Sequence, residues 1–220
     1  MPGWLPRICN GGIKMETTNT VHKILSIDFD FIMAPCIKLY NNMCGGDENP
    51  TISWNRIEAE RNIQNFLDYD ANYLSYIARL IKNNVQNGAT LIPIKEHQEL
   101  VKPIIENPGK IDLVNIDFHH DVLYGNHQAS IVDMDKYNCS NWIFYLYSKN
   151  KLNTCTWVRA PQSDPLIENI EFHFDSILPA RDIKTLGNDF ETIYFCLSPQ
   201  WVPFKFHHLY DLIIDLCQKG

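Results

Sequence analysis

The chain has 220 residues, of which 45% are hydrophobic and 20% are charged, as in an ordinary globular protein. This length predicts one domain with one sizeable core. No run approaches the roughly 20 apolar residues of a membrane-spanning helix, and we see no signal peptide. The net charge of −7 argues against nucleic acid as a partner, because phosphate binding needs a concentrated basic face.

The seven cysteines are scattered and odd in number, and no two form a Cys-x-x-Cys pair. This pattern argues against a disulfide framework and against a zinc knuckle. We therefore expect a protein of the reducing cytoplasm.

The first element is predicted at residues 23–30, a short apolar run that ends in acids, as a buried parallel strand does. Residues 53–84 predict a helix in two pieces. The break falls near Asp70, which can cap the second piece, and Asn87-Gly88 ends it.

Strands and helices alternate along the rest of the chain. Further strands are predicted at residues 89–94, 110–116, 154–158, 170–174 and 192–197, and helical stretches from His97 to Ile105, at 141–148 and at 204–217. The alternation predicts an α/β layered fold with a mainly parallel sheet. We expect residues 1–21 to form a flexible tail and residues 22–220 a single domain.

The strongest chemical pattern is Asp117-x-His119-x-Asp121, directly after the predicted strand at residues 110–116. Residues two apart on an extended backbone point to the same side, so these side chains are expected to converge. Ligands of open parallel sheets bind at the carboxyl ends of the strands. Two carboxylates and an imidazole at one point favour a bound cation. The alternative is an acidic loop that only caps a helix.

Asp28-x-Asp30 ends the strand at residues 23–30 with the same spacing. It predicts a second set of metal ligands. It also resembles the nucleophile motif of haloacid-dehalogenase-type phosphatases, in which a strand ends in Asp-x-Asp-x-Thr or Val. Here Ile32 occupies the last position, no later lysine and acid pair stands out, and the other cluster would be unexplained. The phosphatase alternative therefore ranks lower.

His97 follows the predicted strand at residues 89–94 and would supply a terminal ligand, although a single histidine there is often only a polar loop residue. Ligation dominated by oxygen favours manganese over zinc. Two ions about 3.5–4 Å apart can share a water and lower its pKa. The predicted ligands of two manganese ions are Asp28, Asp30, His97, Asp117, His119 and Asp121.

This combination resembles the metal signature of the arginase/agmatinase (ureohydrolase) superfamily. Ser26-Ile27-Asp28-Phe29-Asp30 is similar to its late motif and residues 117–121 to its central one, and His97 takes the place of its first metal-binding histidine. In arginases the Ser-x-Asp-x-Asp strand comes last, whereas here it comes first. The chain therefore resembles a circularly permuted arginase-like family that includes the peptide arginases of ribosomal peptide pathways.

The resemblance implies a three-layer arginase-like fold in permuted order. It also implies a manganese-dependent hydrolase that turns arginine residues of a precursor peptide into ornithine and releases urea. The Ser/Asn-rich loop that holds a free amino acid is not recognisable here, which favours a peptide as the substrate. The third Asp of the late motif is also missing, since the chain continues as Phe31-Ile32-Met33-Ala34-Pro35.

The catalytic groups around the metal are less well defined. The proton-shuttling histidine of arginases has no clear counterpart, and His127 and His120 are the candidates by sequence proximity. Glu96, Glu171 and Glu191 are candidates for the guanidinium-binding carboxylate. Three other functions stay open: a ureohydrolase of small guanidino compounds, a dehalogenase-type phosphatase, and a non-catalytic peptide-binding module stabilised by metal.

Overall fold

A computed structural model of the chain describes residues 20–33, 68–122, 136–163 and 172–218, with residues 54, 56, 57 and 59. Six strands of this part form one sheet in which every neighbouring pair is parallel. The order across the sheet is β2-β6-β1-β3-β4-β5. The strands are β1 (Val21–Asp28), β2 (Thr90–Ile94), β3 (Lys110–Asp117), β4 (Leu152–Arg159), β5 (Ser176–Pro179) and β6 (Thr192–Cys196).

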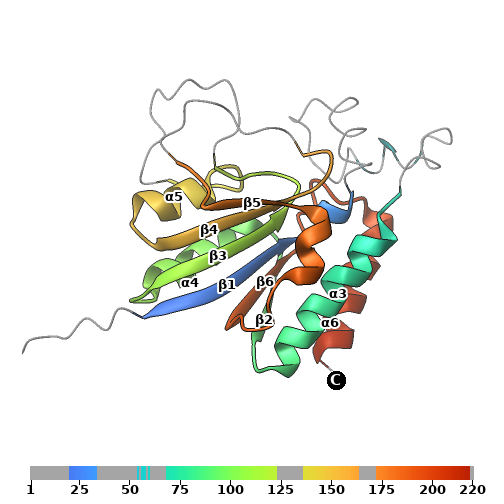
Figure 1. The fold of residues 1–220 in the computed structure, drawn as a ribbon. Coiled ribbons are helices and arrows are strands. Elements are labelled where there is room, and N and C mark those ends of the chain that lie inside the picture. Colours follow the sequence, from blue (N-terminus) through green and yellow to red (C-terminus); the bar gives the residue numbers. More distant parts are fainter. Residues whose placement is uncertain are drawn as a thin grey trace, which may run out of the picture.

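Helices cover both faces of this sheet (Figure 1). α3 (Ala71–Gln86) and α6 (His207–Gln218) pack over the larger apolar core. α4 (Val101–Glu106) and α5 (Trp142–Ser148) pack over a second core on the opposite face. The chain thus folds as helix, sheet and helix layers. The short 3-10 helices are η1 (Phe29–Met33), η3 (His97–Leu100), η4 (Ala180–Thr185) and η5 (Phe204–Phe206).

The central strand β1 is covered on both faces, and its sequence therefore lacks the polar–apolar alternation of a half-exposed strand. Leu25 and Ile27 enter the core under α3 and α6, whereas Ile24 enters the core under α4 and α5. A strand covered on both faces is apolar on both. Because side chains alternate, Asp28 leaves the strand on the same face as Ile24.

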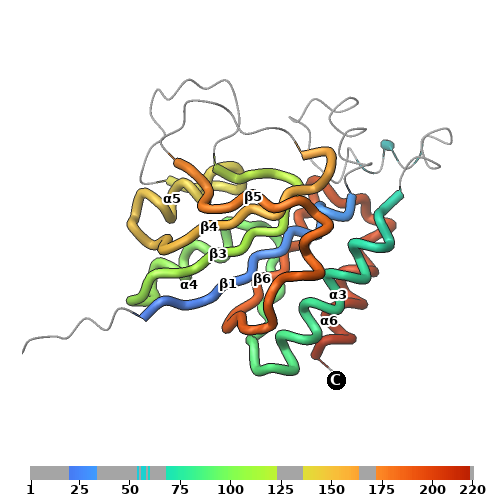
Figure 2. Tube along the Cα trace, in the orientation of Figure 1, coloured from blue at the N-terminus to red at the C-terminus, as the bar shows by residue number. Residues whose placement is uncertain are grey.

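The last of the described strands, β6, lies between β1 and β2 in the sheet. Figure 2 shows β6 beside β1. It pairs Asp28 with Cys196 on one side and Ile94 with Cys196 on the other. The carboxyl ends of β1, β6 and β2 therefore lie level at one edge of the sheet, and β3 continues this edge, since Ile27 pairs with Ile116.

Most predicted elements are confirmed, including the helix that begins after Asp70. The Asp70 carboxylate accepts hydrogen bonds from the N–H groups of Asn72 and Tyr73, and α3 ends before Asn87-Gly88. Residues 54, 56, 57 and 59 are helical, whereas the rest of the first predicted piece, up to residue 67, lies outside the described residues.

Two boundaries and one strand were wrong. β1 begins at Val21, which was assigned to the tail and pairs with Lys110; residues 1–19 lie outside the description. β1 ends at Asp28, and Asp30 belongs to η1. The strand predicted at 170–174 is not one at residues 172–174; the chain pairs with β4 only at residues 176–179. None of the helices in the described ranges is long and apolar enough to cross a membrane.

Candidate metal centre

All six predicted ligands meet at the carboxyl edge of the sheet. Asp28 and Asp117 are the last residues of β1 and β3, and His97 begins η3 just after β2. The remaining ligands, Asp30, His119 and Asp121, follow β1 and β3 in the chain. Their side chains form overlapping groups whose ligand atoms lie within 4.8 Å of one another.

The first group gathers around His97. Its Nδ1 lies 2.9 Å from Asp121 Oδ2, 3.2 Å from Asp117 Oδ2 and 3.5 Å from Asp28 Oδ2. One N–H cannot serve three carboxylates well, whereas a cation surrounded by these oxygens and the ring nitrogen would be coordinated by all of them.

The second group gathers around His119. Its Nδ1 lies 2.9 Å from Asp30 Oδ2 and 4.0 Å from Asp117 Oδ1. Asp117 therefore belongs to both groups, with Oδ2 toward His97 and Oδ1 toward His119. A carboxylate that offers one oxygen to each of two sites is the arrangement expected of a bridging ligand between two ions.

The electrostatics of the cluster also favour cations. All four aspartates are buried. Burial, followed by the charge of neighbouring aspartates, raises the pKa of Asp28 and Asp30, and raises that of Asp121 to about 7. Burial lowers the pKa of His119, but the charges of Asp30, Asp117 and Asp121 outweigh it and bring the pKa to about 9. Four acids and two imidazoles are a donor set that could hold a metal ion.

Hydrogen bonds from neighbouring residues orient the side chains of the candidate ligands. Ser198 Oγ donates to Asp28 Oδ2 at 2.5 Å, and Trp142 Nε1 donates to Asp121 Oδ2 at 2.6 Å. Asn115 Nδ2 donates to Asp117 Oδ2 at 3.2 Å. His97 Nε2 lies 3.3 Å from Ser26 Oγ, which leaves Nδ1 directed at the acids. Such partners orient metal ligands and fix the histidine tautomer.

The backbone is strained at two positions next to the candidate metal centre. Asp121 and Ser198 have φ values of 51° and 47°, in the left-handed region that L-residues rarely occupy. Each such residue costs of order 1–3 kcal/mol and persists where surrounding contacts require it. Here the strained backbone places the Asp121 carboxylate against His97 and the Ser198 hydroxyl against Asp28.

Two neighbours of the centre were missed by the sequence reasoning. Cys196, counted only among the scattered cysteines, ends β6 beside Asp28 and forms a third potential ligand group with Asp28 and His97. Trp201 lies beside the cluster, with its ring centroid 4.7 Å from that of His119. The sequence signal for Cys196 was its position at the end of the predicted strand at residues 192–197, and Trp201 had none.

Of the two candidate catalytic histidines, His120 lies within the described residues and His127 does not. His120 is fully buried, and its Nδ1 accepts the Val122 N–H while its ring packs edge-on against Trp157. It belongs to none of the three ligand groups. His127 and Glu171 lie outside the described residues.

Of the other candidate carboxylates, Glu96 adjoins His97 and is half-buried, and burial raises its pKa, with a further contribution from Glu99. Glu191 was a wrong candidate. It precedes β6 at the amino end of the sheet, where its carboxylate lies 2.8 Å from His22 Nδ1.

Comparison of the chain with protein-family models, with curated proteins and with solved structures found no match. What bears on its function is therefore the arrangement of its own side chains. That arrangement is a buried acid and imidazole cluster at the ligand-binding edge of a parallel sheet.

Proposed function

We propose that this chain is a manganese-dependent hydrolase that converts arginine residues of a precursor peptide to ornithine and releases urea, on a permuted arginase-like fold. The observation that carries the proposal is the convergence of Asp28-x-Asp30, His97 and Asp117-x-His119-x-Asp121 into two ligand groups that share Asp117. Three segments far apart in the sequence supply these ligands, in the combination that resembles the ureohydrolase signature.

Each part of the cluster has a role in this proposal. His97, Asp121 and Asp28 would hold one ion, His119 and Asp30 would hold the other, and Asp117 would contribute to both. Bound there, the ions supply Lewis acidity and a nucleophilic water at neutral pH. Glu96 adjoins His97 in the chain and would be the candidate carboxylate to receive a guanidinium, although its side chain accepts the Glu99 N–H at the start of η3. An acid must also protonate the leaving amine, because an amide anion is too basic to depart.

The experiment is a urea assay on full-length protein supplied with manganese. Asp117→Ala should lose both manganese ions and Asp28→Ala the ion held with His97, and both variants should lose urea release, because each removes a buried ligand. Asp211→Ala, an exposed acid on α6, is the matched control and should retain the manganese and the urea release. Full urea production by both ligand variants would refute the proposal.

The same preparation separates the alternatives. An arginine-containing peptide and free arginine, offered side by side, distinguish a peptide arginase from a small-molecule ureohydrolase. A dehalogenase-type phosphatase would require magnesium and Asp28 but would tolerate His119→Ala. A non-catalytic module would bind manganese and release no urea from any guanidino compound.

A further inference from the structure

A hollow of about 500 Å³ opens at the ends of β4 and β5. Two arginines, Arg159 and Arg181, line it, together with Tyr73 of α3. Pro161 and Pro179 contribute rigid backbone. The hollow thus combines two guanidinium groups with an apolar and aromatic lining, although the chain as a whole carries a net charge of −7.

Strand register fixes how near this hollow is to the centre. Arg159, the last residue of β4, pairs with Asp117, the shared aspartate. Pro179, the last residue of β5, pairs with Arg159. Neighbouring strands lie about 4.8 Å apart, so the hollow begins one strand from Asp117 and extends to the next, roughly 5–10 Å along the edge of the sheet.

The positive charge of the hollow is not neutralised by a close ion pair within the described part of the chain. Arg159 lies over the Trp157 ring at 5.8 Å, and its Nη2 donates to the Ser163 carbonyl at 3.5 Å. Arg181 Nε lies 3.9 Å from Asp182 Oδ1, and the Arg181 side chain is 82% exposed. Planar guanidinium groups in this state bind carboxylates with paired hydrogen bonds.

We infer that this hollow binds an acidic side chain of the peptide substrate, and that the enzyme selects arginines with a glutamate or aspartate one to three residues away. The spacing follows from the geometry, because an extended peptide advances about 3.3–3.6 Å per residue. The inference deepens the proposed function and rests on it. It assigns Arg159 and Arg181 as specificity residues, which bind the substrate away from the reacting carbon.

The test uses three synthetic peptides, each with one arginine flanked two residues away on both sides by glutamate, glutamine or lysine. With full-length manganese-supplied protein, KM for urea release should rise from the glutamate to the glutamine to the lysine peptide. The first step should be about ten-fold, which corresponds to ~1.4 kcal/mol of binding. The Arg159→Gln/Arg181→Gln double variant should lose the difference between the glutamate and glutamine peptides.

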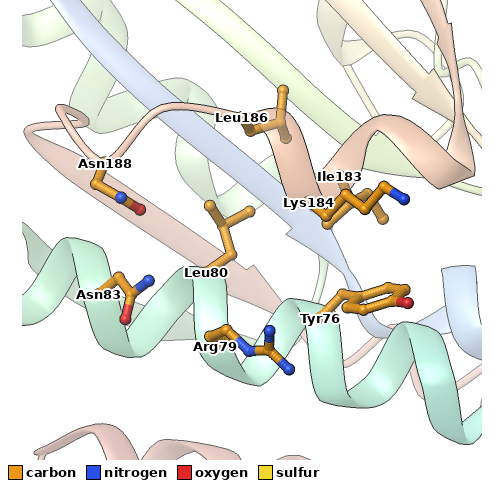
Figure 3. Close-up of a pocket in the computed structure, with 8 residues that line it drawn as sticks. All are labelled: Tyr76, Arg79, Leu80, Asn83, Ile183, Lys184, Leu186 and Asn188. Carbon is orange, nitrogen blue, oxygen red and sulfur yellow. The ribbon is translucent and has the colours of Figure 1, made fainter.

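Arg79→Gln is the matched control. Arg79 lies on α3 in a separate hollow of about 90 Å³ with Lys184 and Asn188 (Figure 3), so its loss should leave the glutamate preference intact. If the double variant does not fold, Arg181→Gln alone replaces it in the test, because Arg181 is exposed and its loss should not disturb folding. Equal KM values for the glutamate and glutamine peptides with the wild-type chain would overturn the inference, as would a preference that survives in the double variant.

Fluorescence anisotropy of the labelled peptides measures their binding without relying on urea release. It therefore distinguishes failure of the acidic recognition from failure of the proposed hydrolase function. Tighter binding of the glutamate peptide, lost in the double variant, supports the acidic recognition even if no urea is released, in which case only the hydrolase assignment fails. Urea release with no difference in KM or in binding contradicts the recognition and leaves the hydrolase assignment standing.

Discussion

Asp117 turns one carboxylate oxygen toward each histidine of the candidate centre, whereas Asp121 faces only His97. The two residues should therefore affect metal content differently. We expect Asp117→Ala to lose both manganese ions and Asp121→Ala to retain about one per chain, since His119, Asp30 and Asp117 stay in place. Elemental analysis after gel filtration measures the stoichiometry, with Asp211→Ala as the two-ion reference. Identical metal content in the two ligand variants would contradict a shared carboxylate.

Ser198 shows what a residue outside the ligand set contributes. Its hydroxyl donates to Asp28, and Ser198→Ala removes that bond without a change in backbone preference. Loss of such a partner typically lowers metal affinity about 10–100-fold. Calorimetric titration with manganese should show this loss. Ser148→Ala, which removes a hydroxyl bound only to the Tyr145 carbonyl, should titrate like the wild type.

The sequence was sufficient to bring the candidate ligands together because each acidic motif follows an apolar strand, and strand ends meet at one edge of a parallel sheet. Cys196 and Trp201 have no such signal. Their positions depend on which strands and helices become neighbours, which residue spacing does not specify.

At the scale of elements, the geometric reason for convergence differed from the expected one. An extended backbone was expected to carry both acids of Asp28-x-Asp30 on one side, but the chain turns into η1 after Asp28. The turn is stabilised locally, since the Asp30 N–H donates to Asp28 Oδ1 at 2.9 Å. In the central motif, His119 faces Asp30 while Asp121 faces His97. Turns after the strands therefore distribute the ligands between two sites.

The misplaced strand has a similar cause. Phe172 and Phe174 alternate as in a strand, yet they pack on Tyr147 and Trp157 without pairing along the sheet. An alternation of apolar residues indicates which side chains are buried. It does not show whether the backbone can pair with a neighbouring strand, which needs a strand edge with unpaired N–H and C=O groups. The edge of β4 pairs with the residues that follow, at 176–179.

Helix α3 offers a test of local stability. Its cap Asp70 accepts two backbone N–H bonds, of 2.9 Å and 3.1 Å, so Asp70→Ala should lower the free energy of unfolding by about 1 kcal/mol. Urea denaturation measures the change. Lys82→Ala, an exposed position on the same helix, should shift it by less than about 0.5 kcal/mol. A loss in Lys82→Ala as large as that in Asp70→Ala would argue against the cap.

For the whole molecule, the titration of the cluster predicts how stability depends on pH. Asp121 titrates near 7 instead of 3.8 and His119 near 9 instead of 6.5. Each raised pKa gives stability that is full below the unfolded value and is lost as pH rises through the folded value. The pKa of Asp117 is lowered by His97 and His119 although burial opposes this, so the stability that Asp117 contributes is lost only in acid. Metal-free protein should therefore become less stable from about pH 4 to about pH 9.

Manganese should reverse this trend, because it binds the deprotonated ligands. At 100 times its Kd, a ligand adds ~2.7 kcal/mol, or roughly 5–10 °C in Tm for a chain of this size. We expect that gain near pH 8 and a much smaller one near pH 5, by thermal melts with and without manganese. His208→Gln, an exposed histidine on α6, should behave as the wild type. An equal gain at both pH values would count against these ligands.

The position of β6 between β1 and β2 also constrains how the protein matures. His97 follows β2 and Asp28 ends β1, and in the described sheet the strand formed by residues 192–196 lies between these two strands and pairs with both. A nascent chain on the ribosome already contains all six ligands once residue 121 has been made. It cannot assemble them until some 75 further residues emerge and the late strand inserts, which is the kind of long-range pairing that folds slowly. If the cluster binds metal as proposed, we expect loading only after this late strand has inserted.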